Sequence, residues 1–490
     1  MKRNKLILAL SALMLGTQAC TDLTEKTYDV IPTNQFGGTA DQQAALIGPL
    51  YNALGGYWEN HFWLNTSTDE QMIPTRGGDW GDGNQWVRLY THTWDPALDN
   101  GRFNGPWTWC YNPISKINIH LATVTDAKTK AELRALRAMF HYQMLDYFGN
   151  VIISDNKDDL APKQSTRKEV FNWIEKELLE AYPDLVETVG GAYYTRFNKY
   201  VVDMILAKLY LNAEVYTGTP RWQDAITRCD NIIKSNKFSL APDFFSTFSV
   251  NNQNAPESIL STAFDKTKRT GFFIQMATLH YKQQLEFNIG NSPWNGPCAV
   301  TEFFNSFTKD DLRYKMWMVG QRFAADGTKL MDDNIPLVLN PEVPALVLPA
   351  GADSRVRGAR CAKYEIQKNN PYGDQDNDFV IFRLGDVYLM RGEAYLRLGK
   401  TAEALADVNV IRARAGVPTY TAATLTLDEL LAERGRELAW EGHRRQDLIR
   451  FGQYNKAWRF KPASQAFRNL FPIPNDQLAL NKNLKQNPGY

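Results

Sequence analysis

Residues 379–416 constrain the fold more than any other stretch, because they contain two helical patterns separated by one short turn. In the first pattern, small and apolar residues recur every three or four positions, as on the buried face of a helix. These residues are Val380, Leu384, Val387, Tyr388, Met390, Ala394, Tyr395 and Leu398. The pattern stops at Gly399, where glycine can adopt the positive φ that closes a helix. The first part of the stretch is therefore predicted to be one helix.

A second helix is predicted directly after this glycine. Thr401 is a suitable N-cap, and Gly416 followed by Pro418 ends the helix. Its predicted buried stripe consists of Ala404, Leu405, Val408 and Ile411. The two helices therefore form an antiparallel hairpin.

This hairpin resembles one tetratricopeptide (TPR) repeat. Gly392 and Ala404 stand at the small positions, where two helix backbones come close, and Tyr388 and Tyr395 stand at the aromatic ones. A single helical hairpin cannot bury its own apolar face, so further helices must pack against it. Helical periodicity recurs in the segments 40–54, 131–147, 170–185, 201–216, 222–235 and 427–441.

Two long segments lack this periodicity. Residues 55–112 are rich in Gly, Asp, Asn and Trp, and regular helix is not expected across most of them. Residues 240–378 contain Pro, Gly and short apolar runs, which predicts an irregular insert lying on the helices. The predicted fold is all-α dominated, with a TPR-like helical hairpin scaffold, a large irregular loop-rich insert and few short strands.

The N-terminal residues predict export and a lipid anchor. The chain begins with three basic residues, Lys2, Arg3 and Lys5. The apolar run at 6–15 is too short for a permanent membrane helix, so residues 1–19 are predicted to be a signal peptide. Cys20 follows directly, which resembles a bacterial lipoprotein signal, in which this cysteine is acylated and anchors the chain to a membrane. The alternative is ordinary secretion with Cys20 merely near the cleavage site.

No motif predicts catalysis, a cofactor, a metal or nucleic acid as a partner. The chain has 55 basic and 54 acidic residues, a balance that does not favour nucleic acid. Its histidines form no H-E-x-x-H, and G-x-S-x-G and G-x-x-x-x-G-K-[ST] do not occur. A carboxylate pair for glycoside hydrolysis stays open, because such residues need not be close in sequence. The cysteines after Cys20 lack C-x-x-C spacing and are expected to be buried free thiols: Cys110, Cys229, Cys298 and Cys361.

Two charged segments are interpreted as structural. The first lies at the end of a predicted helix and is expected to cap it and to join neighbouring elements. It comprises Glu437, Glu441, His443, Arg444, Arg445 and Asp447. The second, Asp374, Asp376 and Asp378, begins like a calcium loop but lacks the glycine and glutamate that such a loop needs. A helix-capping turn is favoured there.

Tryptophans give the clearest indication of binding. Seven of the 13 tryptophans fall within residues 55–112: Trp58, Trp63, Trp80, Trp86, Trp94, Trp107 and Trp109. An indole can stack on the C–H face of a sugar ring while polar side chains bond its hydroxyl groups. Tryptophan is equally a core residue, and for any single one burial is at least as plausible. Trp107 and Trp109, which lead into a helix-forming region, are expected to be packed.

Two polar, glycine-rich loops contain the best candidates for such a platform. Trp80 lies in GGDWGDGN and Trp294 in GNSPWNGP, and Trp317 in RYKMWMVGQ is a further candidate. The hypothesis is that these rings converge into one shallow site with polar residues at its edge. The polar candidates are Arg76, Asp79, Asp82, Asn84 and Asn295.

Several segments resemble the SusD/RagB family of outer-membrane nutrient-binding lipoproteins, and they occur in that family's order. They are AELRALRAMFHYQMLDYFGNVII, FRLGDVYLMRGEAYLRLGKTAEALADVNVIRARAG, RGRELAWEGHRRQDLIRFG and LFPIPNDQLALNKNLKQNPGY. The resemblance implies a helical side that faces a TonB-dependent SusC-like transporter and a loop-rich side that faces the ligand. It also implies a lipid anchor at the outer membrane, on the cell surface.

The expected organisation is a signal peptide at 1–19 and one SusD-like domain at 20–490. Within that domain we expect a lipid-anchored tether at 20–39, an N-terminal helical part at 40–239, the insert at 240–378, and the C-terminal hairpin and tail at 379–490. The leading function is non-catalytic capture of a glycan for the transporter. Three alternatives stay open: capture of peptides, as the RagB branch implies, a surface glycoside hydrolase, and a pure protein adaptor.

Overall fold

The computed structural model describes residues 40–159 and 161–490. The predicted signal peptide, Cys20 and the tether up to residue 39 lie outside the described residues. Residues Ile47–Tyr490 form one compact unit. Within the described residues, no helix combines the length and apolarity needed to cross a membrane.

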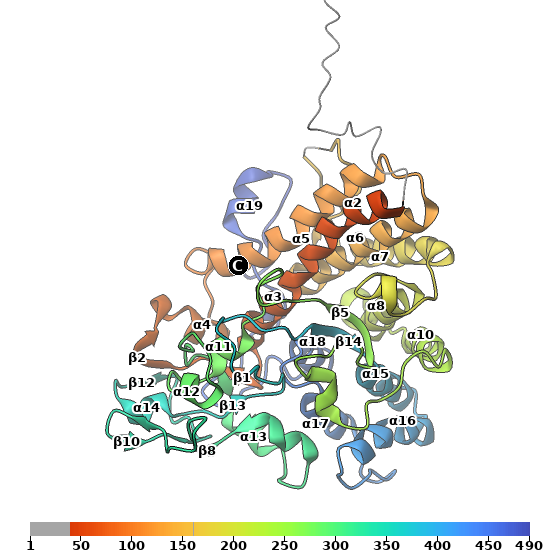
Figure 1. Cartoon of the computed structure of the whole chain (residues 1–490). Coiled ribbons are helices and arrows are strands. Elements are labelled where there is room, and N and C mark those ends of the chain that lie inside the picture. Colours follow the sequence, from red (N-terminus) through yellow and green to blue (C-terminus); the bar gives the residue numbers. More distant parts are fainter. Residues whose placement is uncertain (1–39, 160) are drawn as a thin grey trace, which may run out of the picture. The chain divides into compact units, whose positions relative to one another are not determined.

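Seven helices follow one another in contact and form what we call the helical row (Figure 1). They are α5 (Asn100–Leu121), α6 (Ala127–Phe148), α7 (Arg167–Ala181), α8 (Lys199–Leu211), α10 (Trp222–Lys234), α15 (Leu384–Arg397) and α16 (Thr401–Arg414). Each packs on the next, so every hairpin buries the apolar face of its neighbour. The predicted helical scaffold is confirmed.

The hairpin of α15 and α16 closes as its glycines predict. Gly399 and Gly416 both have positive φ, at 73° and 72°. A Cβ atom on Gly392 would lie 2.9 Å from Val408 Cγ2, so only glycine permits this helix spacing. Two details differ from the sequence prediction. Phe379–Arg383 form a strand instead of the start of the first helix, and Lys400 rather than Thr401 is the N-cap of α16.

The remaining helices are shorter or lie outside the row. They are α2 (Ala40–Asn52), α3 (Gly56–Leu64), α4 (Gln85–Thr91), α9 (Ala213–Thr217), α11 (Ile274–Thr278), α12 (Gln283–Phe287), α13 (Thr301–Asn305), α14 (Ala352–Arg355), α17 (Leu427–Leu438), α18 (Arg444–Arg450) and α19 (Asn475–Leu480). The expectation that residues 55–112 lack regular helix is wrong, because α3, α4 and much of α5 lie there. Packing of α5 against α6 outweighs the cost of Pro106 within it.

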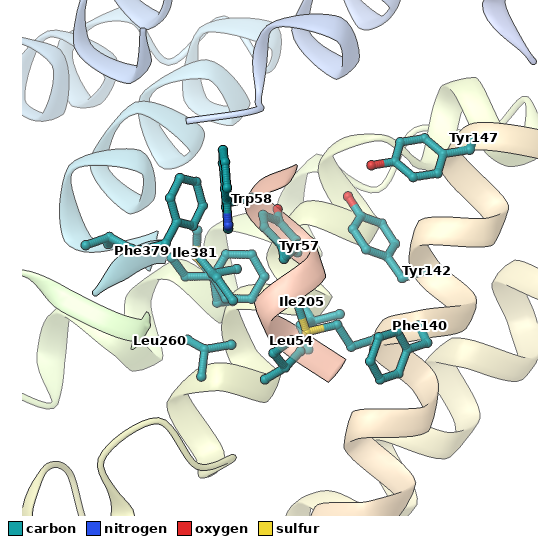
Figure 2. Packing of buried hydrophobic residues seen from close by; sticks show 14 of the residues in the cluster. Leu54, Tyr57, Trp58, Phe140, Tyr142, Tyr147, Ile205, Leu260, Phe379 and Ile381 are labelled. Carbon is teal, nitrogen blue, oxygen red and sulfur yellow. The ribbon is translucent and has the colours of Figure 1, made fainter. Parts of the chain in front are cut away.

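Helix α3 runs through the main core, as Figure 2 shows. Its Tyr57 and Trp58 are buried, and Trp58 keeps only 1% of its surface exposed. In that view Phe140 from α6 lies on one side of α3, and Phe379 from the strand before α15 lies on the other. An apolar surface on several sides of α3 explains why sequence periodicity did not reveal it.

The strands are short and pair two by two. They are β1 (Gln71–Met72), β2 (Thr75–Trp80), β3 (Val151–Ile152), β4 (Gln164–Ser165), β5 (Ser258–Thr262), β6 (Cys298–Ala299), β7 (Trp317–Met318), β8 (Gly320–Gln321), β9 (Met331–Asp332), β10 (Ile335–Pro336), β11 (Val338–Leu339), β12 (Val347–Leu348), β13 (Arg360–Cys361) and β14 (Phe379–Arg383). The pairs are β1–β6, β3–β4, β5–β14, β7–β13, β8–β11, β9–β10 and β2–β12, of which only β2–β12 is parallel among the described strands. Figure 1 shows β2, β8, β10, β12 and α14 gathered away from the helical row.

Residues 240–378 are irregular, as predicted, and share the main core with the helices. Phe272, Phe303 and Trp317 belong to the same buried cluster as Ile205 of α8. The acidic residues of the insert tie two of its own segments together and do not cap a helix as expected. Asp374 accepts from the backbone of Gly271, and Asp378 accepts from the backbone of Phe264. The cysteines after Cys20 are buried free thiols, as predicted.

A buried set of ion pairs, here called the frame network, joins the helices to the insert. At its centre Glu437 of α17 accepts hydrogen bonds from Arg383 at 2.7 Å and Arg313 at 3.1 Å, and also from Arg414. Burial alone would raise the pKa of Glu437, but the guanidinium groups of Arg414, Arg383 and Arg313 hold it below the ordinary range. The network also includes Asp311, Lys363, Glu257, Glu433 and Glu441. The 437–447 segment therefore joins neighbouring elements as expected, but its charged side chains do not cap α17 or α18.

Candidate functional site

The loop that contains Trp80 has an unusual backbone. Gly77, Gly78 and Gly83 have positive φ, and so do Trp80 at 59° and Asn84 at 64°. A positive φ is costly for a bulky residue and needs support from its surroundings. Two contacts supply that support: Trp80 Nε1 donates to the carbonyl of Trp294 at 2.8 Å, and the Trp80 ring lies against Gly296. A Cβ atom on residue 296 would lie only 2.3 Å from that ring, so glycine is required there.

Trp294 lies beside Trp80 and presents its ring to solvent. Its side chain is 40% exposed, while Trp80 is half-buried. Phe273 contacts the Trp294 ring with the centroids 5.3 Å apart. We call Trp80 and Trp294, with the exposed polar residues Asp79, Asp82 and Asn84, the aromatic patch.

Two of these polar residues are held by aromatic side chains. Asp79 accepts a hydrogen bond from the Tyr281 hydroxyl, and Asp82 accepts from Trp86 Nε1 at 2.6 Å. Tyr281, which the sequence analysis did not single out, therefore fixes one edge of the patch. Burial, followed by its hydrogen bond with Asp79, raises the pKa of Tyr281 to about 12, so this hydroxyl stays protonated as a donor.

Arg76 lies under the patch and not on its surface. It is buried, and its guanidinium group donates to the carbonyls of Asn295 at 2.6 Å, Gly296 at 3.0 Å and Arg357 at 3.0 Å. Burial lowers the pKa of Arg76 from its ordinary value. The expectation that Arg76 edges an exposed site is therefore wrong, since it anchors the loop that follows Trp294.

Asn295 is also buried beneath the patch, where it holds the backbone of neighbouring loops. Its side-chain amide donates to the carbonyl of Arg355 at 3.1 Å, and its oxygen accepts from Arg360 at 2.5 Å. Burial, together with the nearby charge of Arg76, lowers the pKa of Arg360 to about 9. Asn295 is thus another anchor, and its predicted place at the rim of the site is wrong.

Trp317 is part of the core. Only 4% of its surface is exposed, and Phe303, Phe304, Phe307 and Trp440 pack around its ring. A ligand cannot reach a ring enclosed in this way, so Trp317 does not belong to the patch. Met316 and Met318 flank it in the sequence, and this apolar context was the signal for burial.

A third indole connects the patch to a groove. The ring centroid of Trp63 lies 5.8 Å from that of Trp80, and the buried Trp86 packs beneath both rings. Trp63 also lines a groove of about 370 Å³ between α3 and the first turns of α5. Of the two indoles expected to be packed, Trp107 is buried, whereas Trp109 is half-buried and lines this groove.

Among the described residues, no group of three or more His, Cys, Asp or Glu side chains is arranged to hold a metal ion. The aromatic patch instead combines one exposed indole, one half-buried indole and three exposed polar side chains on a fixed backbone. Such a surface can bind a ligand that has both apolar faces and hydroxyl groups.

Comparison with known proteins identifies two matching families. Residues 256–490 match the SusD family, and residues 27–211 match a family described as starch-binding and associating with the outer membrane. The starch-binding protein SusD of Bacteroides thetaiotaomicron is 27% identical over 98% of this chain and 97% of its own length. A SusD-like protein of Bacteroides ovatus is 23% identical over 94% of this chain and 86% of its own.

Solved structures share the fold. A laminarin-binding SusD-like protein superposes with a TM-score of 0.75 at 21% identity, covering 92% of this chain and 99% of the other. Surface glycan-binding protein A from Bacteroides thetaiotaomicron, in complex with laminarihexaose, gives a TM-score of 0.71 at 18% identity, covering 91% and 99%.

Proposed function

Because this chain belongs to the SusD family, we propose that it is a cell-surface glycan-binding protein of the outer membrane. It captures an oligosaccharide or polysaccharide and delivers it to a TonB-dependent SusC-like transporter. The names of its relatives support this role, since one is a starch-binding protein and another was solved with laminarihexaose. Acylation of Cys20, which lies outside the described residues, would anchor the protein to the membrane.

The observation that carries this proposal is the pair of adjacent indoles in the aromatic patch. A sugar ring stacks on Trp294, and Trp80 extends the apolar surface towards α3. Asp79, Asp82 and Asn84 are exposed beside these rings and bond the hydroxyl groups of the glycan. The Trp294 indole N–H has no acceptor within the described chain and can donate to the same ligand.

The patch is fixed before ligand arrives. Arg76 and Asn295 hold the backbone on the C-terminal side of Trp294, and Trp80 binds the Trp294 carbonyl. Little conformational freedom is then lost on binding, which favours affinity on an open surface. The role is binding without catalysis: Asp79 and Asp82, the two carboxylates beside the rings, are engaged by Tyr281 and Trp86 as parts of the surface.

The test is affinity electrophoresis of the purified protein against a panel of polysaccharides that includes starch and laminarin. We expect at least one polysaccharide to retard the protein, and Trp294→Ala to abolish that retardation. The matched control is Trp222→Ala, because Trp222 is also half-buried but lies on α10 of the helical row. The control variant should be retarded like the unmodified protein.

Two outcomes would overturn the proposal. One is the absence of retardation by every polysaccharide, together with binding of a casein digest that Trp294→Ala leaves unchanged, which would favour peptide capture. The other is cleavage of a retained polysaccharide by the protein, detected as new reducing ends, which would make it a hydrolase.

A further inference from the structure

The groove between α3 and α5 has the composition of a second binding surface. It is lined by two half-buried indoles, Trp63 and Trp109, and by polar side chains of Glu59, Asn60 and Arg102. Its volume of about 370 Å³ falls within the range of small-molecule pockets. The wall formed by α5 carries Gly101 and Gly105, which are exposed and leave the space open.

The two indoles are held in different ways. Trp109 Nε1 donates to the carbonyl of Ala53 at 2.7 Å, and Gly56 lies so close to its ring that a Cβ atom there would be 2.6 Å away. The Trp109 ring is therefore fixed, and its N–H is satisfied. Trp63 Nε1, in contrast, has no acceptor within the described part of the chain. It is a donor available to a ligand.

The polar residues of the groove also have unused capacity. The carboxylate of Glu59 is exposed and forms no ion pair within the described chain. Arg102 donates through Nη2 to Gln85 at 3.1 Å and lies over the Trp86 ring, while its Nη1 has no hydrogen-bond partner among the described residues. An acceptor and donors thus lie beside two apolar ring faces. This combination suits a pyranose better than it suits a purely apolar or a purely ionic ligand.

The groove is continuous with the aromatic patch through Trp63, whose ring contacts Trp80. We propose that the groove is a second sugar subsite, which holds a further ring of the oligosaccharide that lies on Trp294. This inference rests on the proposed function, because the same glycan spans both surfaces. Affinity then rises with chain length until a chain reaches from Trp294 past Trp80 and Trp63 into the groove.

Gly105 allows the groove to be filled without removing any contact. A Cβ atom on Gly105 would have no neighbour within 4 Å, and the residue lies within α5. Gly105→Leu occupies the space in front of the indoles, whereas Gly105→Ala gives the same helix a similar gain in propensity but leaves most of the space open. The two variants form a matched pair.

The experiment measures calorimetric affinities of these variants for maltose, maltoheptaose, laminaribiose and laminarihexaose. For the series that binds, we expect Gly105→Leu to weaken binding of the long oligosaccharide about fivefold and to leave the disaccharide unchanged, as loss of one stacked ring implies. Gly105→Ala should match the unmodified protein. Equal affinity of Gly105→Leu and Gly105→Ala for the long oligosaccharide would overturn the subsite.

A second measurement observes the groove directly. Protein labelled with 15N at tryptophan is titrated with the same four sugars, with the indole signals of Trp63 and Trp294 assigned from Trp63→Phe and Trp294→Phe. We expect both signals to move with the long oligosaccharide. If only the Trp294 signal moves, the subsite is wrong and the proposed function stands. If neither moves with any of the four sugars, and no polysaccharide of the panel retards the protein, both proposals fail.

Discussion

In the frame network, Arg313 and Arg383 donate mainly to carboxylates, whereas beneath the aromatic patch Arg76 and Arg360 donate mainly to main-chain carbonyls. The first arrangement joins regular elements to one another and neutralises buried charge. The second fixes loops that have few ladder hydrogen bonds of their own. The difference indicates that the helices are stabilised as a rigid body, while the binding loops are stabilised at particular backbone atoms.

The largest effect should follow from breaking the frame network at its centre. Glu437→Gln removes the charge that compensates three buried guanidinium groups, so we expect the free energy of unfolding to fall by about 3–5 kcal/mol. Urea denaturation measures this change. Glu403→Gln, at an exposed position on α16, is the control and should change stability by no more than about 0.5 kcal/mol. A loss below about 1 kcal/mol for Glu437→Gln would contradict the view that the frame network stabilises the helices by neutralising buried charge.

Breaking the anchor under the patch should affect both stability and binding. Arg76→Met leaves the carbonyls of Asn295 and Gly296 without their donor, while the Arg357 carbonyl keeps the hydrogen bond from Arg360 at 2.9 Å, and we expect a loss of about 2–3 kcal/mol. Glycan affinity should fall as well, because the backbone next to Trp294 is released. Lys309→Met, at an exposed position, should change neither quantity. An Arg76→Met protein with full affinity would mean that the patch does not depend on this anchor.

Acid should destabilise the fold through the buried imidazole of His443. Burial, assisted by the charge of Lys208, lowers the pKa of His443 from 6.5 to about 3. Below pH 6.5 the unfolded chain binds a proton at His443 that the folded protein excludes. The contribution of His443 to the free energy of unfolding is therefore retained above pH 6.5 and falls as the pH decreases towards 3. We expect His443→Gln to reduce the loss of stability between pH 7.5 and 5.0 by roughly 2 kcal/mol.

Urea denaturation at the two pH values, for the variant and the unmodified protein, measures this difference. His120→Gln is the control, since His120 is only half-buried on α5 and should contribute less. If His443→Gln leaves the pH dependence unchanged, the imidazole of His443 is not the group that titrates.

The smallest effect is expected for Trp317→Phe. Its ring is packed among Phe303, Phe304 and Phe307, and its Nε1 has no hydrogen-bond partner in the described chain, so the variant loses only packing. We expect a loss of roughly 1 kcal/mol in thermal unfolding experiments. Glycan affinity should be unchanged, in contrast to Trp294→Ala. Weaker glycan binding by Trp317→Phe would mean that Trp317 contributes to the binding site after all.

The sequence predicted α7, whose buried residues form a single stripe, and also the long helix α6, which is buried on every side from residue 135 to residue 148. It did not predict α3, which is apolar on several sides, or the part of α5 that contains Pro106, because tertiary packing stabilises both. For the site, local composition indicated the exposure of Trp294. It could not indicate the burial of Arg76 and Asn295, because that burial arises from contacts between residues more than 200 positions apart.

Arg76 and Arg360 donate mostly to main-chain carbonyl oxygens, which every residue type possesses. These hydrogen bonds therefore do not depend on which side chains stand at neighbouring loop positions. The residue at position 294 can accordingly be replaced without loss of these hydrogen bonds. Substitutions at this one position can therefore change the sugar preference while the loop backbone keeps its conformation.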